Sequence, residues 1–258
     1  MKKEVIANIP NLLKFFEDLN SNRDKWTNSS TGESFENNIV KLLKHNGFDR
    51  ISKNNDKVLT QYLKEIKEDV INPLKIEVLP NNLIKKGLEY KNFFVFQPYG
   101  SQSYPDLLLF TKENIYEIEL KHTVSGKGYP MWNGNLPKSN GIYIFGSSKI
   151  KDITFFTGES ILPHNERIEH LKDYGLIVKF YEEIMEKRKE AFRQGKIKLE
   201  VGFDSYPRKT FTQSKNINKN ADLDFFKSKK RPKRECEVFE LIEKHENKSL
   251  KKHDKLKK

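Results

Sequence analysis

The sequence predicts an α/β protein, because strand-like and helix-like runs are intermixed along one chain. Short apolar runs rich in branched and aromatic residues predict strands. Longer runs with apolar residues at every third or fourth position predict helices. The predicted strands cover 91–97, 106–110, 115–123, 142–145, 153–157 and 196–203. The predicted helices cover 10–20, about 31–46, 56–71, about 165–194 with a break near Gly175, and 237–245.

Two of these strands form a predicted β-hairpin, with residues 106–110 as the first strand and 115–123 as the second. The four residues 111–114 form the turn. If a four-residue turn joins the strands, Phe110 lies opposite Ile115, and counting outwards places Asp106 opposite Glu119. Side chains alternate between the two faces of a strand, so Asp106, Glu119 and Lys121 share one face.

Glu117 is a fourth member of this polar face and lies opposite Leu108. Opposed Cβ atoms in a hairpin are about 5 Å apart, and two carboxylates at that distance repel each other unless a positive group lies between them. A divalent cation with oxygen ligands satisfies the pair, and Mg²⁺ commonly takes one or two carboxylates plus water and phosphate oxygens. The face therefore predicts a Mg²⁺ site with Asp106 and Glu119 as ligands and Glu117 as a secondary candidate. The alternative is the solvated face of an ordinary antiparallel strand.

A further carboxylate lies in the predicted helix that precedes the hairpin. Ser30 and Glu33 have the spacing of a capping box, and Gly47 ends the helix. Glu36 lies at the border of the apolar face of this helix. We expect Glu36 either to point towards the metal site or to be an ordinary solvated glutamate.

Charge and cysteine content limit the possible partners. The 258 residues carry a net charge of +12, which favours an anionic partner such as nucleic acid. The one cysteine, Cys236, excludes an internal disulfide and a cysteine-rich zinc site, which fits a reducing cytoplasm. No signal peptide and no run of transmembrane length is evident, so no membrane partner is expected.

The basic residues are concentrated at the C-terminal end. Residues 206–258 hold 17 lysines and arginines against 8 aspartates and glutamates, and so carry +9 of the total charge. We therefore divide the chain into a core at 1–205 and a basic C-terminal segment at 206–258, which either stands apart as an extension or belongs to the same domain.

The hairpin residues resemble a known signature. Tyr104-Pro105-Asp106 followed by Glu119-Leu120-Lys121 resembles the motif of the PD-(D/E)XK nuclease superfamily, and Glu36 resembles the additional helix glutamate of many type II restriction endonucleases. The resemblance covers roughly 31–157. It implies a central mixed β-sheet flanked by helices, Mg²⁺ dependence and hydrolysis of DNA phosphodiesters. It also implies that Asp106 and Glu119 bind the metal, that Lys121 positions or activates the attacking water, and that Glu36 assists catalysis.

This resemblance favours a Mg²⁺-dependent, sequence-specific endonuclease of double-stranded DNA. A homodimer is expected if the target is palindromic, because two-fold symmetry of the protein then matches two-fold symmetry of the DNA. A repair or structure-selective nuclease of the same superfamily is one alternative. A basic nucleic-acid-binding protein without an active site is another.

Polar residues around the hairpin are candidates for DNA contact, because amides suit adenine, and lysine and arginine suit guanine and phosphate. The alternative for most of them is a long surface loop. The candidates are Gln102, Asn133, Asn135, Lys138, Asn140, Arg208, Lys209, Lys230 and Arg231. Trp132, in the same stretch, is expected to pack in the core rather than between bases.

Overall fold

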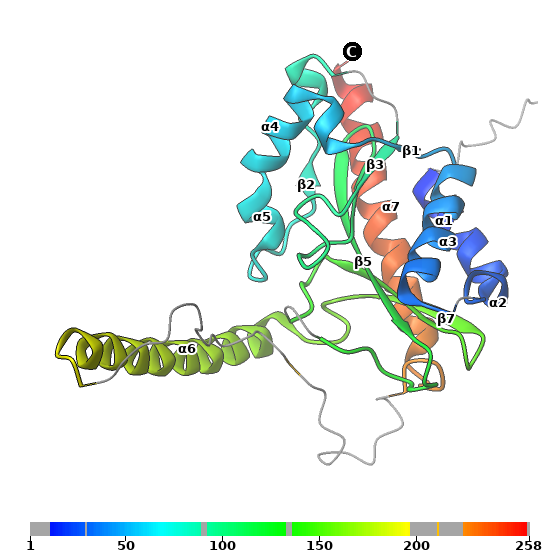
Figure 1. Cartoon of the computed structure of the whole chain (residues 1–258). Coiled ribbons are helices and arrows are strands. Elements are labelled where there is room, and N and C mark those ends of the chain that lie inside the picture. The colour runs from blue at the N-terminus through cyan, green and yellow to red at the C-terminus, as the bar shows by residue number, and fades with distance from the viewer. Residues whose placement is uncertain are drawn as a thin grey trace, which may run out of the picture.

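A mixed seven-stranded β-sheet lies at the centre of the computed structural model (Figure 1), which confirms the α/β class. The structure describes residues 11–28, 30–88, 92–132, 136–196, 211 and 224–256. The strand order is β1-β3-β4-β5-β6-β7, and β2 pairs with β5 off this path. The β1–β3 and β5–β6 pairs are parallel and the other pairs antiparallel. The strands are β1 (Asp49–Arg50), β2 (Leu79–Pro80), β3 (Phe93–Phe96), β4 (Leu107–Phe110), β5 (Asn114–Thr123), β6 (Ile142–Ser147) and β7 (Asp152–Thr157).

Helices cover both faces of the sheet. Helices α1, α3 and α7 enclose one hydrophobic cluster, and α4 and α5 enclose a second on the opposite face. The helices are α1 (Asn11–Ser21), α2 (Arg23–Trp26), α3 (Gly32–His45), α4 (Lys57–Glu65), α5 (Lys67–Ile71), α6 (His164–Arg193) and α7 (Arg231–Leu256), with 3₁₀ turns η1 (Lys53–Asn55) and η2 (Ile84–Lys86). Among the helices that the structure describes, none combines the length and the apolar character needed to cross a membrane.

The strand β4 is buried on both faces because helices cover both sides of the sheet. Leu107 and Leu109 join the cluster under α1, α3 and α7, whereas Leu108 and Phe110 join the cluster under α4 and α5. An uninterrupted apolar run is what a strand covered by helices on both sides requires.

The predicted hairpin register is confirmed. Phe110 pairs with Ile115 and Leu108 pairs with Glu117 in the β4–β5 ladder. The second strand begins one residue earlier than predicted, at Asn114. Glu246 of α7 closes this end of the hairpin, because its carboxylate accepts hydrogen bonds from the Tyr116 hydroxyl at 2.8 Å and the Asn114 amide at 2.9 Å.

Several predicted helix boundaries differ from the structure. The capping box of α3 uses Thr31 and Ser34 instead of Ser30 and Glu33, because the extended Thr31 directs its hydroxyl at the Ser34 amide. The predicted helix at 56–71 is divided into α4 and α5 at Ile66.

Helix α6 runs through Gly175 without a break, so the break predicted near Gly175 is wrong. A glycine in an exposed helix costs only about 1 kcal/mol, which the rest of a long helix offsets. The strand predicted at 196–203 falls almost entirely outside the described residues.

The basic C-terminal segment contributes a core helix. Helix α7 is much longer than the predicted 237–245, and its Val238 and Ile242 are fully buried in the cluster that α1 and α3 share. This part of the basic segment therefore packs against the sheet and the helices α1 and α3.

Arg231 lies at the start of α7 and was predicted to contact DNA, but its guanidinium bonds inside the protein. It donates to both carboxylate oxygens of Asp152, at 2.6 and 2.7 Å, and to Glu235 at 3.0 Å. Arg23 also donates to Glu235, at 2.7 Å. The planar fork of an arginine suits such bidentate pairing, and here it joins α7 to β7. The DNA contact predicted for Arg231 stays a prediction, but these bonds already give its guanidinium a role within the fold.

Replacing Glu235 by glutamine should lower the free energy of unfolding at neutral pH by about 1.5–3 kcal/mol, the range for hydrogen bonds to a charged group. Burial pushes the pKa of Glu235 upward, but the bonds from Arg23 and Arg231 outweigh it and hold the pKa below its ordinary value of 4.5. A lowered folded-state pKa means that the contribution is complete above pH 4.5 and disappears as the pH falls through the folded-state value. Urea unfolding should therefore show the wild type and the Glu235→Gln protein converging in acid; a constant gap would contradict the prediction.

Candidate functional site

The structure brings Asp106 and Glu119 together where β4 begins beside β5. The backbone amide of Asp106 donates to the Glu119 carboxylate at 3.2 Å, and the amide of Leu120 donates to the Asp106 carboxylate at 2.8 Å. Each carboxylate is therefore fixed by the backbone of the neighbouring strand. This is the arrangement that the register predicts, in which Asp106 lies opposite Glu119.

Lys121 points into the same space. Its ammonium lies 2.7 Å from the Glu119 carboxylate, and the two side chains are 21% and 14% exposed. The Trp132 ring lies 6.0 Å from the ammonium and forms the apolar wall on that side. The lysine is thus held beside the carboxylate pair, with access to solvent retained.

The electrostatics show how closely these carboxyl groups interact. Burial and the neighbouring charge of Glu119 raise the pKa of Asp106 to about 7, although the Leu120 amide and Lys121 act in the opposite direction. Burial, then Glu33, then Glu119 raise the pKa of Glu36 on α3. Glu36 therefore lies within electrostatic range of the pair.

The donor set fits Mg²⁺ better than a softer metal. Asp106 and Glu119 offer hard carboxylate oxygens, and a divalent cation between them would cancel the repulsion that raises the pKa of Asp106. In the described part of the chain, no group of three or more histidine, cysteine, aspartate or glutamate side chains is arranged to hold a metal ion. Water and substrate oxygens would have to complete the coordination, as they commonly do for Mg²⁺.

Glu117 shares the face of the pair but is bonded inside the protein. Its two carboxylate oxygens accept hydrogen bonds from the Lys138 ammonium at 2.7 Å and from the Tyr104 hydroxyl at 2.9 Å. Burial raises the pKa of Glu117 to about 7 despite both partners. Asp106 and Glu119 are thus the better-placed metal ligands.

Lys138 was predicted to contact DNA, and the structure corrects this. The side chain is 2% exposed, and besides Glu117 its ammonium donates to the carbonyls of Asp69 at 2.7 Å and Val70 at 2.9 Å. A buried lysine needs this kind of complete pairing, because an unpaired charge in the interior is costly. Lys138 joins the hairpin to the end of α5.

The other predicted DNA contacts have different outcomes. Asn140 is corrected, because it is 8% exposed and its amide donates to the Glu77 carbonyl. Gln102 and Lys230 lie on the exposed surface. Trp132 packs against Tyr143 in the core, as expected. The remaining candidates lie outside the described residues; they are Asn133, Asn135, Arg208 and Lys209.

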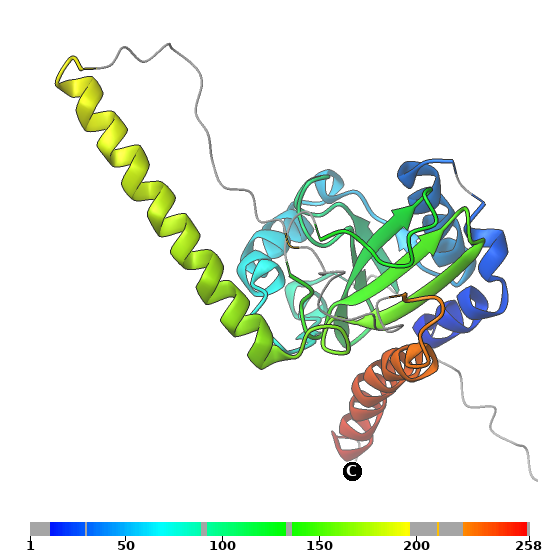
Figure 2. The ribbon, with the colours of Figure 1, turned by 90° about the horizontal axis from the view of Figure 1, so that it is seen from below.

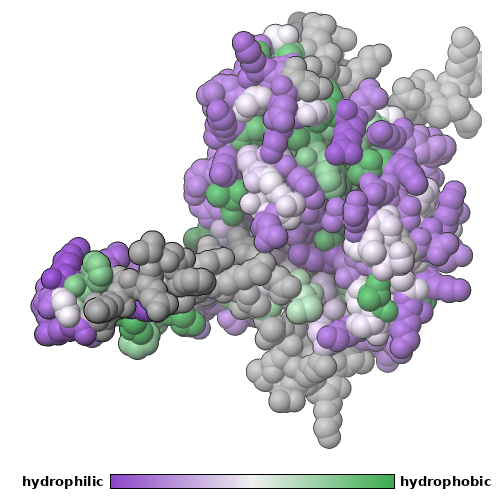
Figure 3. Space-filling view, in the orientation of Figure 1, coloured by the Kyte–Doolittle hydropathy of each residue, from purple (hydrophilic) through white to green (hydrophobic). Residues whose placement is uncertain are grey.

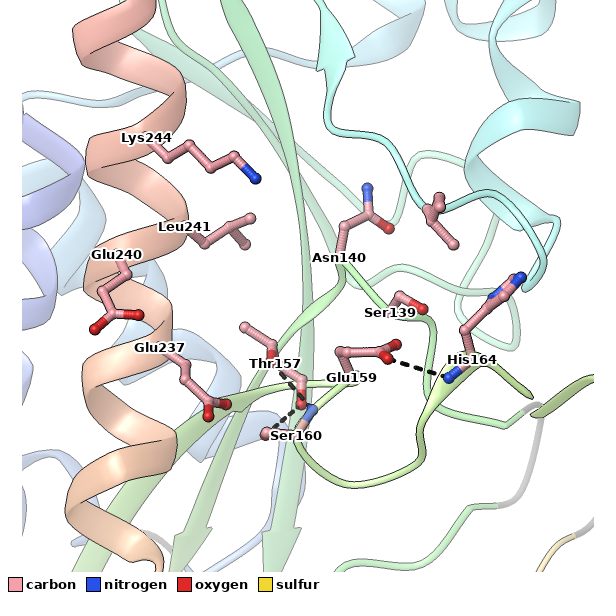
Figure 4. Close-up of a pocket in the computed structure, with 11 residues that line it drawn as sticks. Ser139, Asn140, Thr157, Glu159, Ser160, His164, Glu237, Glu240, Leu241 and Lys244 are labelled. Carbon is pink, nitrogen blue, oxygen red and sulfur yellow. Dashed lines mark hydrogen bonds between the residues drawn. The ribbon is translucent and has the colours of Figure 1, made fainter. Parts of the chain in front are cut away.

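A separate pocket of about 550 Å³ lies between α7 and the loop that follows β7 (Figure 4). Glu237, Glu240 and Lys244 line it on the α7 side, and Asn140, Glu159 and His164 lie across from them, so the lining is acidic on balance. An acidic lining does not favour a DNA phosphate. None of the candidate catalytic residues lines this pocket, so the carboxylate pair remains the candidate site.

Arg167 is a buried charged residue near the site that the sequence did not single out. Arg167 is fully buried and donates to the Pro137 and Leu162 carbonyls and the Ser139 hydroxyl, which fixes the base of α6 to the loop beside Lys138. In the sequence it is one charged residue on a charged helix. Its hydrogen bonds go mostly to backbone and hydroxyl oxygens, and its ion pair with Glu159 at 3.6 Å joins the helix to the loop before it, so no local pattern marks the residue as buried.

Comparisons with known proteins give no match. No protein-family model, no curated protein and no solved structure matches the chain.

Proposed function

We propose that the protein is a Mg²⁺-dependent endonuclease of double-stranded DNA that acts in the manner of a type II restriction enzyme and belongs to the PD-(D/E)XK superfamily. The observation that carries the proposal is the side-by-side placement of Asp106 and Glu119, with Lys121 2.7 Å from Glu119. A close carboxylate pair with an adjacent lysine is a costly arrangement that metal-dependent hydrolysis would explain.

Each residue has a defined role in this proposal. Asp106 and Glu119 would hold the metal, which when bound supplies Lewis-acid activation of the phosphodiester and of water. Lys121 orients the attacking water or a phosphate oxygen through its ammonium. Glu36 adds negative charge on the α3 side and so strengthens the attraction for a cation. The backbone amides of Asp106 and Leu120 fix the orientation of both carboxylates.

The charge of the chain supports a nucleic-acid substrate. A net charge of +12 attracts DNA at long range. Gln102 and Lys230 are exposed residues that suit base and phosphate contacts. Such an enzyme would act in the cytoplasm, and a palindromic target would require two copies of the chain.

Digestion of plasmid DNA tests the proposal. The wild type should cut in Mg²⁺ and not in excess chelator, while Asp106→Ala and Lys121→Ala should each reduce cutting by at least about a hundredfold, the scale of losing one transition-state interaction. Glu17→Ala and Lys127→Ala remove the same charges at exposed positions and should cut normally. The proposal would be contradicted if the wild type showed no Mg²⁺-dependent cutting, or if Asp106→Ala and Lys121→Ala were both fully active.

The same digest separates the alternatives. Discrete bands indicate a sequence-specific enzyme, whereas a smear or preference for branched DNA indicates a repair or structure-selective nuclease. DNA binding without any cleavage would indicate a basic nucleic-acid-binding protein.

A further inference from the structure

Helix α6 stands away from the body of the protein (Figure 2). Its 30 residues span about 45 Å at 1.5 Å per residue. Its N-terminal end is fixed to the body by the buried Arg167, and the remainder extends outward. In proteins most of the stability of a helix comes from packing of its apolar face, so a packing partner is expected along α6.

One face of the projecting helix is apolar and exposed. Leu176 is 68%, Ile177 58%, Phe180 66% and Ile184 46% exposed. These positions follow the three- and four-residue spacing of a single helix face. Figure 3 shows apolar side chains along this helix. Large apolar side chains gathered in water mark an interaction surface rather than chance exposure.

Charges of opposite sign lie at the two ends of this apolar face. Asp173 lies seven residues before Phe180 and Lys187 lies seven residues after it, both exposed. Leu176 and Ile184 lie four residues before and after Phe180. Leu176 and Ile184 are therefore placed symmetrically about Phe180, with charges of opposite sign beyond them, whereas the position symmetric to Ile177 is Glu183.

We propose that α6 is the self-association surface of this protein, on which the α6 helices of two copies pack antiparallel about Phe180. In that arrangement Phe180 meets Phe180 of the second copy, Leu176 lies against the copy's Ile184, and Asp173 lies near its Lys187. The contact is self-complementary, as a two-fold interface must be.

The charges select the antiparallel orientation. In a parallel pair, Asp173 would face Asp173 of the second copy, and Lys187 would face Lys187. Like charges in these positions oppose association. The antiparallel pair places opposite charges together twice. Each body then lies near the tip of the other copy's helix, because each α6 leaves its body at the N-terminal end.

This inference goes beyond the nuclease proposal, because it depends on α6 alone. Self-association without cleavage would support it while the nuclease proposal failed. Cleavage by a protein that remains a monomer would overturn it while leaving the nuclease proposal intact.

Sedimentation of the full-length chain over a range of concentrations tests the surface. The wild type should form a dimer. Asp173→Lys and Lys187→Asp should each weaken it at least about tenfold, because every opposed pair becomes a like-charge pair. The double variant, Asp173→Lys with Lys187→Asp, should restore the dimer. A monomeric wild type, or a dimer indifferent to both single changes, would overturn the proposal. Circular dichroism melts confirm that the exposed changes leave each chain folded.

Crosslinking gives an independent readout of the contact. In a Cys236→Ser background, Phe180→Cys should form a disulfide between two copies under mild oxidation. Glu182→Cys is the matched control, because two residues turn a helix by about 200° and place it on the opposite face. Equal crosslinking of the two variants, or no crosslinking of the Phe180→Cys protein, would contradict the proposed contact.

Discussion

Replacing Lys138 by methionine should lower the free energy of unfolding by about 3–5 kcal/mol, the cost of removing one partner of a buried ion pair. Methionine fills most of the same space but leaves the carboxylate of Glu117 buried without its ammonium partner. The carbonyls of Asp69 and Val70 lose the same donor. The measurement is urea unfolding, with the midpoint and the slope followed together.

The double variant with Glu117→Gln and Lys138→Met is the decisive control. It removes both charges, and the Tyr104 hydroxyl can still donate to the glutamine oxygen. Replacing a whole buried ion pair often costs little, so the double variant should recover much of the stability that Lys138→Met loses. If both proteins were equally destabilised, the loss would come from packing and not from the unpaired charge.

The contrast between Glu117 and Glu119 shows what the sequence could predict. Period-two alternation placed both on one face, and counting from the turn placed Asp106 beside Glu119; the ladder of Phe110 with Ile115 confirms that register. Both steps use only local geometry, which a strand imposes on any sequence. The polar face of the hairpin was therefore predictable.

The partner that separates Glu117 from Glu119 was not predictable. Lys138 is 21 residues from Glu117 along the chain, and its ammonium also reaches the end of α5. Nothing in a run of polar residues between glycines and prolines distinguishes a buried lysine from a solvated one. The same reason applies to Arg231, whose basic surroundings indicated DNA while its bonds go to Asp152 and Glu235. Long-range ion pairs are set by tertiary packing.

In the absence of metal, the Asp106 carboxylate should lower the free energy of unfolding of the protein. Replacing it by asparagine should raise the free energy of unfolding in chelator by about 1–3 kcal/mol, the scale of a buried charged group without full compensation. Asparagine keeps an oxygen that can accept from the Leu120 amide, but it removes the charge that opposes Glu119. Thermal unfolding in chelator measures this, with Glu17→Gln as the exposed control that should change nothing.

Mg²⁺ should stabilise the wild type more than it stabilises Asp106→Asn. A ligand that binds only the folded state stabilises it by RT ln(1 + [L]/Kd), which is about 2.7 kcal/mol at a hundred times Kd. The wild type should gain this stabilisation when Mg²⁺ replaces chelator, whereas Asp106→Asn, which lacks one of the two proposed ligands, should gain little. Because the readout is stability, it examines metal binding even if the DNA target is unknown. A Mg²⁺ shift of equal size in both proteins would place the metal elsewhere. Stabilisation by Asp106→Asn in chelator, combined with loss of the Mg²⁺ shift, would mean that the carboxylate pair is retained for the cation and not for the fold.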